Sequence, residues 1–384
     1  MDRMESNDVI IDFSVILFQG RWERIKYIEG NGVDGVSAFT IKDIAKICNV
    51  GISTVSRAIN DDPRINQGTK ERILKVIEEY HYVPNNSARN LKMTESNTIA
   101  LLIKGIDNQF FQAMLKLYEA ELKKMEYTLL IHAVGEEQDD ASVAIELAKE
   151  KRLKGIIFLG GLMNYPEEEM DMIGIPYVLC TVASDVNRPK QNCLSVSIDD
   201  EKESYKAVDY LCRKGHRRIA IITGRETDFA IGGLRLKGYQ RALADNGIAY
   251  DPELVRYMKM DIPEYSAANG YQVTKELLES GVDFTAIYVI SDLTAFGAYK
   301  AIFDAGKRIP EDFSVMGFDG LEATRYYHPS LTTIVQPSSE MVKCSIELLM
   351  DAIAGKKEMR QLIMEANLLE RDSVADISDM ALRD

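Results

Sequence analysis

The chain has 384 residues, of which 46% are hydrophobic and 28% charged, and a formal net charge of −14. This balance is typical of a globular protein of two or three domains and excludes a mostly disordered chain. No apolar run approaches the ~20 residues that a membrane-spanning helix needs. The five scattered cysteines form no C-x-x-C pair, which fits a reducing cytoplasm better than disulfides or a zinc site.

Residues 1–37 form an acidic N-terminal extension, with four Lys or Arg against seven Asp or Glu. Its apolar stretch 9–18 lacks the pattern of a signal peptide, because acidic residues precede it and Asp12 interrupts it. We expect this extension to be either a poorly ordered arm or the product of a start site assigned too early, with the true start near Val33 or Val36.

A small domain of three helices is predicted for residues 38–84. Thr40 and Asp43 form the S/T-x-x-[DE] pattern that begins many helices, and residues 49–51 interrupt the apolar periodicity that follows. A second helix and then a third, capped by Asn66, complete the domain. Two short helices joined by a tight turn suit the DNA major groove. The residues predicted to face the core are Ile44, Ala45, Val55, Ile59, Ile73, Val76 and Ile77.

The acidic net charge does not argue against DNA binding, because charge is distributed unevenly along the chain. Residues 38–93 contain nine Lys or Arg and six Asp or Glu, whereas residues 94–384 contain 33 and 47. Salt screens each charge beyond about 10 Å. A locally basic segment can therefore bind phosphate while an acidic body limits nonspecific adhesion to DNA.

The pattern changes after Pro84. Residues 85–97 are predicted to be a hinge helix and a linker, and from Thr98 short apolar runs alternate with amphipathic stretches. This alternation predicts an α/β fold with parallel sheets, long enough for two Rossmann-like subdomains. Ligands of such sheets bind beyond the carboxyl ends of the strands. The predicted strands are 99–103, 127–134, 155–160, 177–180, 219–223, 286–291 and 314–318, and the predicted helices are 110–126, 141–152, 201–214, 232–246, 266–280 and 292–305.

Motifs of the common enzyme classes are absent from the sequence. It contains no phosphate-binding glycine loop, no G-x-G-x-x-G that follows a predicted strand, no H-E-x-x-H and no G-x-S-x-G. The four histidines are far apart and lack the spacing of metal ligands. The sequence therefore predicts a binding protein with no catalytic residues, no cofactor and no metal, rather than an enzyme.

Eight motifs fall in one order along the chain: "TIKDIAKICNVGISTVSRAIN", "YVPNNSARNLK", "KGIDNQFFQAM", "GHRRIAIITG", "RLKGYQRAL", "SDLTAFGAYKAI", "VMGFDG" and "HPSLTTIVQP". Their order and spacing resemble the lac/gal repressor family of bacterial transcriptional regulators over roughly residues 40–374. The resemblance implies a helix-turn-helix domain followed by a body similar to periplasmic sugar-binding proteins. It also implies an effector-controlled regulator, most readily a repressor of carbohydrate-utilisation genes.

The resemblance places the effector-binding and dimerisation body at residues 98–374. Its two α/β subdomains are expected at approximately 98–198 plus 328–358 and 199–327 plus 359–374. The tail that follows, residues 375–384, is too short for the heptads of a tetramerising coiled coil. We therefore expect a cytoplasmic homodimer without membrane contact that binds a palindromic double-stranded operator.

The second helix is expected to read DNA bases. Arg57 can donate two hydrogen bonds to guanine, Ile52 suits a thymine methyl, and Thr54 and Ser56 suit phosphates. By resemblance, Leu91 of the hinge enters the minor groove as an apolar wedge. Alternatively, residues 41–60 are simply core helices of a bundle. The expected DNA-binding residues are Thr40, Ile52, Ser53, Thr54, Ser56, Arg57, Asn60, Ser87, Ala88, Leu91 and Lys92.

A small carbohydrate effector is expected between the two subdomains, where guanidinium and carboxylate groups can bind vicinal hydroxyls and aromatic rings can stack on a sugar. By resemblance to the family, Arg235, Asp292 and Asp319 bind the effector. Asn108, Phe110 and Phe111 are expected in the loop after the first strand of the body, where they would wall the site, and Ser291 is the remaining expected effector residue. Two alternatives stay open: Phe110 and Phe111 as helix core, and Arg235 with Asp319 as a buried structural ion pair. The competing function is a sugar-binding protein that does not bind an operator.

Overall fold

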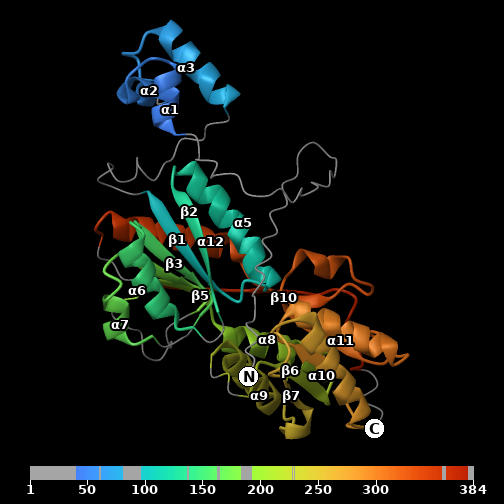
Figure 1. The fold of residues 1–384 in the computed structure, drawn as a ribbon. Helices are drawn as coiled ribbons and strands as arrows, with labels where there is room; N and C mark the ends of the chain where they lie inside the picture. The colour runs from blue at the N-terminus through green and yellow to red at the C-terminus, as the bar shows by residue number, and fades with distance from the viewer. Residues whose placement is uncertain are drawn as a thin grey trace, which may run out of the picture. The chain divides into compact units, whose positions relative to one another are not determined.

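The computed structural model describes residues 40–59, 62–80, 97–135, 138–161, 165–182, 193–226, 228, 230–356 and 360–378 (Figure 1). The chain divides into two compact units, residues 1–92 and 93–384, each with its own hydrophobic core. Among the described residues, no helix combines the length and the apolarity needed to cross a bilayer.

The first unit contains three helices: α1 (Ile41–Ile47), α2 (Ile52–Ile59) and α3 (Gln67–Glu79). Their predicted core is confirmed, since Ile44, Val55 and Ile73 are each 0% exposed and pack together. The polar starts of the helices are satisfied locally. Asp43 accepts hydrogen bonds from the backbone N–H and the hydroxyl of Thr40 at 2.8 and 2.6 Å, and the Asn66 side chain accepts from the N–H of Gly68 at 3.0 Å.

The second unit contains two sheets of six strands each. The first sheet is parallel throughout, with the order β11-β5-β4-β3-β1-β2. Its strands are β1 (Thr98–Lys104), β2 (Thr128–Val134), β3 (Gly155–Leu159), β4 (Tyr177–Cys180), β5 (Ser195–Ile198) and β11 (Gln361–Met364). The helices of this subdomain are α5 (Gln109–Lys124), α6 (Asp140–Glu150), α7 (Glu167–Asp171) and α12 (Ser338–Ile353).

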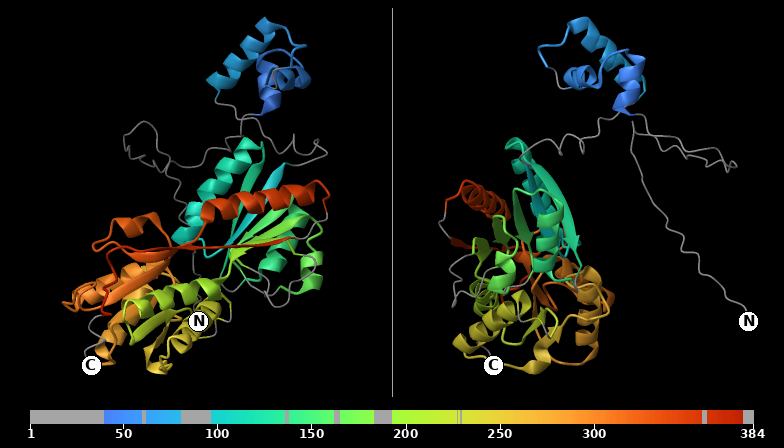
Figure 2. Two further views of the ribbon diagram at one scale, coloured as in Figure 1. Left: turned by 180° about the vertical axis from the view of Figure 1, so that it is seen from behind. Right: turned by 60° about the vertical axis from the view of Figure 1, so that its left-hand side comes forward.

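Helices on both faces of the first sheet explain why its strands are apolar without alternation. On β1, Ile99 and Leu101 belong to the core cluster that includes residues of α5 and α12. The neighbouring residues Ala100 and Leu102 point the other way, into a second cluster with residues of α6. Figure 2 shows these helices on either side of the sheet.

The second sheet has the order β12-β10-β9-β8-β6-β7, and only β12 runs antiparallel to its neighbour among the described pairings. Its strands are β6 (Ile219–Thr223), β7 (Val255–Tyr257), β8 (Ala286–Val289), β9 (Ser314–Asp319), β10 (Thr332–Val335) and β12 (Asn367–Leu369). The helices of this subdomain pack in two pairs. Helix α8 (Asp200–Arg213) packs against α9 (Ile231–Asp245), and α10 (Ala267–Glu279) packs against α11 (Asp292–Asp304). Two short 3₁₀ helices, Pro252–Leu254 and Glu322–Arg325, lie in its loops.

The predicted strands and helices of the second unit agree with the structure to within two residues at each end. The predicted subdomain boundaries are wrong at two strands. β10, expected in the first subdomain, pairs with β9 of the second sheet, and β11, expected in the second, pairs with β5 of the first. Strand pairing decides membership, and a four-residue strand carries too little periodicity to reveal its partner. In the described chain, the crossovers between sheets therefore lie at Asp199, 336–337 and 365–366.

Helix α8 holds the last of these crossovers. The Nζ of Lys206 donates to the backbone oxygen of Ala366 at 2.6 Å and forms an ion pair with Glu203 at 2.5 Å. Glu203 is 0% exposed. The Nζ of Lys202 forms a second ion pair with Glu365 at 2.8 Å, but this pair lies in solvent, with side chains 51% and 79% exposed. The two lysines thus hold the same segment in very different environments.

We predict that Lys206→Met is much more destabilising than Lys202→Met. Removing one partner of a buried ion pair costs about 3–5 kcal/mol, and the partial exposure of Lys206 reduces this to roughly 2–3 kcal/mol. An exposed pair contributes about 0–1 kcal/mol. Urea unfolding of the two variants measures the difference in the free energy of unfolding. Equal losses would contradict a specific role for Lys206.

Candidate functional site

A cavity of about 390 Å³ lies between the two subdomains of the second unit. As expected for parallel sheets, much of its lining immediately follows strand ends. Lys104 ends β1, and Gly160, Thr181, Ser291 and Asp319 end or follow β3, β4, β8 and β9. The remaining lining residues are Gly105, Asp107, Asn108, Phe110, Phe111, Gly161, Val182, Arg225, Asp228, Ala230, Ile231, Arg235, Pro263, Glu264, Tyr265 and Gln336.

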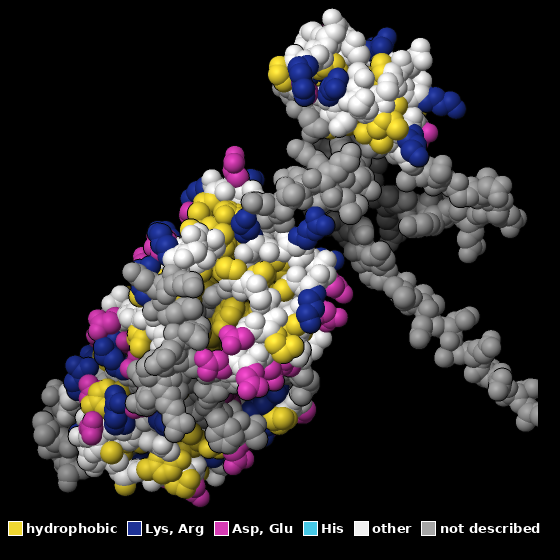
Figure 3. Space-filling model, turned by 90° about the vertical axis from the view of Figure 1, so that its left-hand side faces the viewer, with side chains coloured by type: hydrophobic (Ala, Val, Ile, Leu, Met, Phe, Trp, Pro, Cys, Tyr) yellow, Lys and Arg dark blue, Asp and Glu magenta, His cyan; other side chains and the backbone are white. Residues whose placement is uncertain are grey.

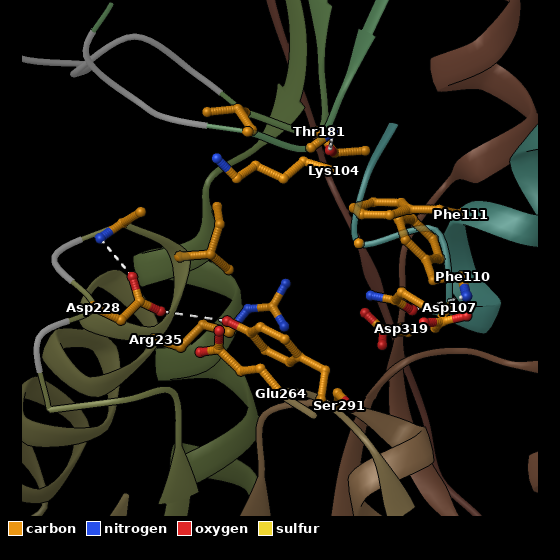
Figure 4. A pocket seen from close by; sticks show the side chains of 18 of the residues that line it. Lys104, Asp107, Phe110, Phe111, Thr181, Asp228, Arg235, Glu264, Ser291 and Asp319 are labelled. Carbon is orange, nitrogen blue, oxygen red and sulfur yellow. Dashed lines mark hydrogen bonds between the residues drawn. The ribbon is translucent and has the colours of Figure 1, made fainter. Parts of the chain in front are cut away.

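Asn108, Phe110 and Phe111 form the wall contributed by the first subdomain (Figure 4). Asn108 caps α5 by accepting a hydrogen bond from the N–H of Phe110 at 3.0 Å. The two phenylalanines lie in the first turn of α5 rather than in a loop, with ring centroids 5.8 Å apart. Phe110 is 4% exposed and also belongs to the core. It therefore combines the two roles considered from sequence, helix core and cavity wall.

Arg235 of α9 lies at the opposite wall and is held by a buried ion pair. Its Nε and Nη2 lie 2.9 and 2.8 Å from Oδ1 of Asp200, and its Nη1 donates to the backbone oxygen of Ile290. The guanidinium also stacks 3.6 Å from the ring centroid of Phe318. Arg235 and Asp200 are 5% and 4% exposed. The expected structural alternative was thus half correct: an ion pair exists, but its carboxylate is Asp200 rather than Asp319.

Asp319 ends β9 in a strained backbone conformation. Its φ is +117°, a region that side chains rarely occupy and that is found at functional sites. Its Oδ1 accepts a hydrogen bond from Nε2 of Gln336 at 2.8 Å. Burial raises the pKa of Asp319 to about 7, and the charge of Arg235 opposes this shift. The strained turn thus directs the Asp319 carboxylate into the cavity, where it binds the Gln336 amide and is stabilised by the charge of Arg235.

Asp292 is the one expected effector residue that does not line the cavity. It is 0% exposed, and its carboxylate accepts hydrogen bonds from the N–H groups of Gly320 and Leu321, both at 2.7 Å, and from the Thr333 hydroxyl at 2.6 Å. Burial raises its pKa. Asp292 therefore fixes the turn that follows Asp319, while its neighbour Ser291 lines the cavity and caps α11.

Asp228 and Tyr265 line the cavity without having been predicted from sequence. The Asp228 carboxylate accepts from the N–H groups of Ala230 and Gly232 at 2.8 and 2.9 Å, next to the start of α9, and from the Tyr265 hydroxyl at 3.3 Å. A Cβ at Gly224 would lie 2.5 Å from this carboxylate, so glycine makes room for it. An Asp four residues before the predicted helix 232–246 was the available signal.

Lys104 lies at the top of the cavity in Figure 4 and is also ion-paired. Its Nζ lies 3.0 Å from Asp140 and donates to the Gln138 backbone oxygen at 2.9 Å. Arg225 has a looser partner in Glu264, at 3.8 Å. No cluster of His, Cys, Asp and Glu suited to a metal ion occurs in the described part of the chain.

The surface of α2 is the second candidate site. Ile52 is 46% exposed, and Ser53 and Arg57 are exposed, whereas Thr54 and Ser56 are half-buried. Residues four positions apart lie on the same face of a helix. Ile52 therefore lies beside Ser56, and Ser53 lies beside Arg57. Lys and Arg are prominent on the face of this unit seen in Figure 3. The expected DNA-binding residues Asn60, Ser87, Ala88, Leu91 and Lys92 lie outside the described residues.

Thr40 directly precedes α1, and Gly51 directly precedes α2. The Thr40 side chain donates to Asp43, and its expected contact with DNA stays a prediction. At Gly51 a Cβ would meet the Ser53 and Thr54 hydroxyl oxygens at 3.6 and 3.9 Å, which are ordinary contacts. A residue with a side chain would therefore fit at position 51, which caps α2, without a steric clash.

The comparisons with known proteins agree with this two-part organisation. Residues 40–85 match the model for bacterial regulatory proteins of the lacI family, and residues 208–374 match a periplasmic binding protein-like domain. The chain is 38% identical over 343 residues to the HTH-type transcriptional regulator MalR of Clostridium butyricum, covering 88% of this chain and 99% of the relative. The chain belongs to the lacI family. It is a DNA-binding transcriptional regulator and not an enzyme.

Other members of the family match most of the chain. The chain is 31% identical to the ribose operon repressor of Haemophilus influenzae, over 87% of this chain and 98% of the relative. A solved complex of the transcriptional regulator CelR with cellobiose superposes with a TM-score of 0.64 at 28% identity, covering 87% of this chain and 99% of that one. The lac repressor dimer bound to operator and the anti-inducer ONPF has the same fold, with a TM-score of 0.67, 23% identity and coverage of 88% and 100%.

We predict that Arg235→Gln destabilises the second unit by about 3–5 kcal/mol, because it leaves the Asp200 carboxylate buried without its partner. Asp200→Asn in the same chain should restore part of this loss, since no unpaired charge then remains. A double-mutant cycle by urea unfolding measures the coupling, which we expect to be roughly 1–3 kcal/mol. Additive losses would show that the two groups do not depend on each other.

Proposed function

We propose that this protein represses carbohydrate-utilisation genes by binding a palindromic operator as a homodimer, under the control of a small carbohydrate bound in the 390 Å³ cavity. The observation that carries the proposal is the composition of the cavity. Arg235 and Asp319 present donors and acceptors beside the aromatic Phe110 and Phe111. This mixture suits a ligand with hydroxyl groups on an apolar ring.

The named ligands of the relatives support a carbohydrate. The relative crystallised with cellobiose and the repressor named for a ribose operon both match this chain over nearly their whole length. A second relative of known structure, from Enterococcus faecium, contains bound ribose and is 28% identical with a TM-score of 0.63. Each matches this chain across the subdomains that form the cavity.

Control by the ligand follows from the position of the cavity. A ligand that touches α5 from the first subdomain and Arg235 from the second favours one relative orientation of the two sheets. The crossovers at Asp199, 336–337 and 365–366 are the segments through which that orientation changes. Ligand and operator affect each other's affinity by the same factor, because both bias one equilibrium.

The operator-binding surface proposed for the protein is the exposed face of α2. Arg57 provides the long donor, Ser53 a small polar group and Ile52 an apolar contact for a thymine methyl. Thr54 and Ser56 suit phosphate contacts, which position the helix without selecting a sequence. For the residues outside the described ranges, Leu91 is proposed as the minor-groove wedge and Asn60, Ser87, Ala88 and Lys92 as further contacts.

We predict that Arg57→Ala weakens binding to the specific operator by about 1–3 kcal/mol, because the bidentate contact with guanine is lost. The operator is first selected from a random pool of duplexes by the full-length protein, and affinity is measured by fluorescence anisotropy. A scrambled duplex is the control, on which the variant should lose much less. An equal loss on both duplexes would assign Arg57 to phosphate contact.

The salt dependence of binding tests operator recognition itself. Each phosphate contact releases counterions, so affinity should fall linearly on a log–log scale with salt, with a slope of roughly −0.9 per phosphate neutralised. A protein that only binds sugar would give no saturable, salt-dependent binding to the selected duplex. Such a result would sink the proposed function.

A dimer is proposed from an exposed aromatic surface on α11 and the following loops. Tyr326, Phe303 and Tyr327 are 74%, 43% and 40% exposed, and Tyr327 stacks on Phe296 with ring centroids 3.9 Å apart. The fold relative solved on operator is itself a dimer. Exposed rings of this size mark association surfaces.

We predict that Tyr326→Ser lowers the dimer affinity at least ten-fold, because its exposed ring is then no longer available for burial. Analytical ultracentrifugation of the full chain measures the dissociation constant, with Tyr250→Ser, 44% exposed on another loop of the same subdomain, as the control. A wild-type monomer or tetramer would refute the proposed assembly.

A further inference from the structure

The charges around the cavity restrict the ligand beyond its being a carbohydrate. Among the described lining residues, the three cations Lys104, Arg225 and Arg235 already have carboxylate partners, which are Asp140, Glu264 and Asp200. Two of these pairs are at 3.0 Å or less and largely buried. A cation that is neutralised inside the protein offers little net attraction to an anionic ligand.

Carboxylates outnumber the cations at this site. Asp107, Asp228 and Asp319 line the cavity in addition to Glu264, and Asp140 and Asp200 lie directly behind it. Three cations thus face six carboxylates, and protonation of Asp319 would still leave five. A phosphate or carboxylate on the ligand would be repelled in a partly desolvated site, where like charges cost several times more than in water.

The hydrogen-bonding capacity that remains suits neutral hydroxyl groups. A guanidinium has five N–H donors. In Arg235, Nε and Nη2 face Asp200 and Nη1 donates to Ile290, so one further N–H on each terminal nitrogen stays available. Asp319 uses Oδ1 to accept from Gln336, and a carboxylate has about four acceptor sites. The cavity therefore presents both unused donors and unused acceptors, as neutral hydroxyl groups require.

The size of the cavity favours two sugar rings. If each carbon with its oxygen occupies about the ~30 Å³ that a water molecule takes in the liquid, a hexose needs roughly 180 Å³ and a disaccharide roughly 350 Å³. The cavity measures about 390 Å³. A single hexose would occupy about half of this volume, and a disaccharide would occupy most of it.

The polar and aromatic groups are also spread over both ends of the cavity. Phe110, Phe111 and Asp107 lie on one side of it in Figure 4, and Asp228 lies at the other, with Arg235 and Asp319 between. Two linked rings would contact the first subdomain and the second at once, as control of their relative orientation demands.

We propose that the effector is a neutral disaccharide, selected against monosaccharides by the size of the cavity and against phosphorylated sugars by its excess of carboxylates. This inference rests on the proposed function, since it specifies the ligand of the same site.

The test is a matched ligand series on the full-length chain. Calorimetry without DNA compares the neutral disaccharides cellobiose, maltose, lactose, sucrose and trehalose with the hexoses glucose, galactose and fructose. Cellobiose 6′-phosphate and maltose 6′-phosphate report the effect of a phosphate. At least one neutral disaccharide should bind at least ten-fold more tightly than every hexose and at least ten-fold more tightly than the phosphorylated pair. Tightest binding by a hexose or a phosphorylated sugar, or no binding by any of the five disaccharides, would overturn the proposal.

Ionic strength gives an independent readout of ligand charge. The dissociation constant of a neutral ligand should change by less than about two-fold between 50 and 500 mM salt, because screening acts on charged pairs. A ten-fold change would show that net charge drives binding and would contradict the proposal.

Operator binding separates this inference from the proposed function. The selected duplex is titrated with the protein alone and then with the tightest disaccharide. Disaccharide binding without operator binding would overturn the proposed function and leave the ligand assignment standing. Operator binding that responds only to a hexose or a phosphorylated sugar would support the proposed function and overturn the ligand assignment.

Discussion

Parallel strand pairing is the constraint on which the candidate site depends. In a parallel sheet all carboxyl ends meet at one edge, so residues that are far apart in sequence, such as Lys104, Thr181 and Asp319, arrive around one volume. Close approach there requires special backbone. A Cβ at Gly160 would lie 2.8 Å from the Lys104 backbone oxygen, and Thr181 adopts a φ of +73°. The sheet thus provides the position, and strained or small residues provide the space.

Buried charge connects this site to the segments between the subdomains. Asp200 begins α8 and binds Arg235 at the cavity, while Lys206, six residues later, holds the crossover at Ala366. Six residues of helix span about 9 Å, so one rigid element carries both contacts. Helix α8 therefore contacts both the cavity wall and the crossover. Glu203 lies between Asp200 and Lys206 on this helix, and its buried carboxylate forms an ion pair with Lys206.

Sequence periodicity predicted most of the framework, because a strand buried on both faces and an amphipathic helix each leave a long, regular pattern. Six of the seven expected effector residues line the cavity, whereas Asp292 turns away to bind the backbone of the Asp319 turn. Asp228 was missed because it sits in a loop, where no periodicity reports the direction of a side chain. The partner of Arg235 was missed for a related reason, since Asp200 lies 35 residues earlier on a different helix.

By itself, the sequence determined that a basic helix-turn-helix precedes an acidic α/β body, because helical spacing, capping residues and local charge are properties of neighbouring residues. It also determined which residue types stand at the strand ends. Only the tertiary structure decided that β10 and β11 exchange sheets, that Arg235 pairs with Asp200, and that every described cation of the cavity is already neutralised. These facts depend on distances between residues far apart in the chain, and pairing distances are set by packing rather than by sequence order.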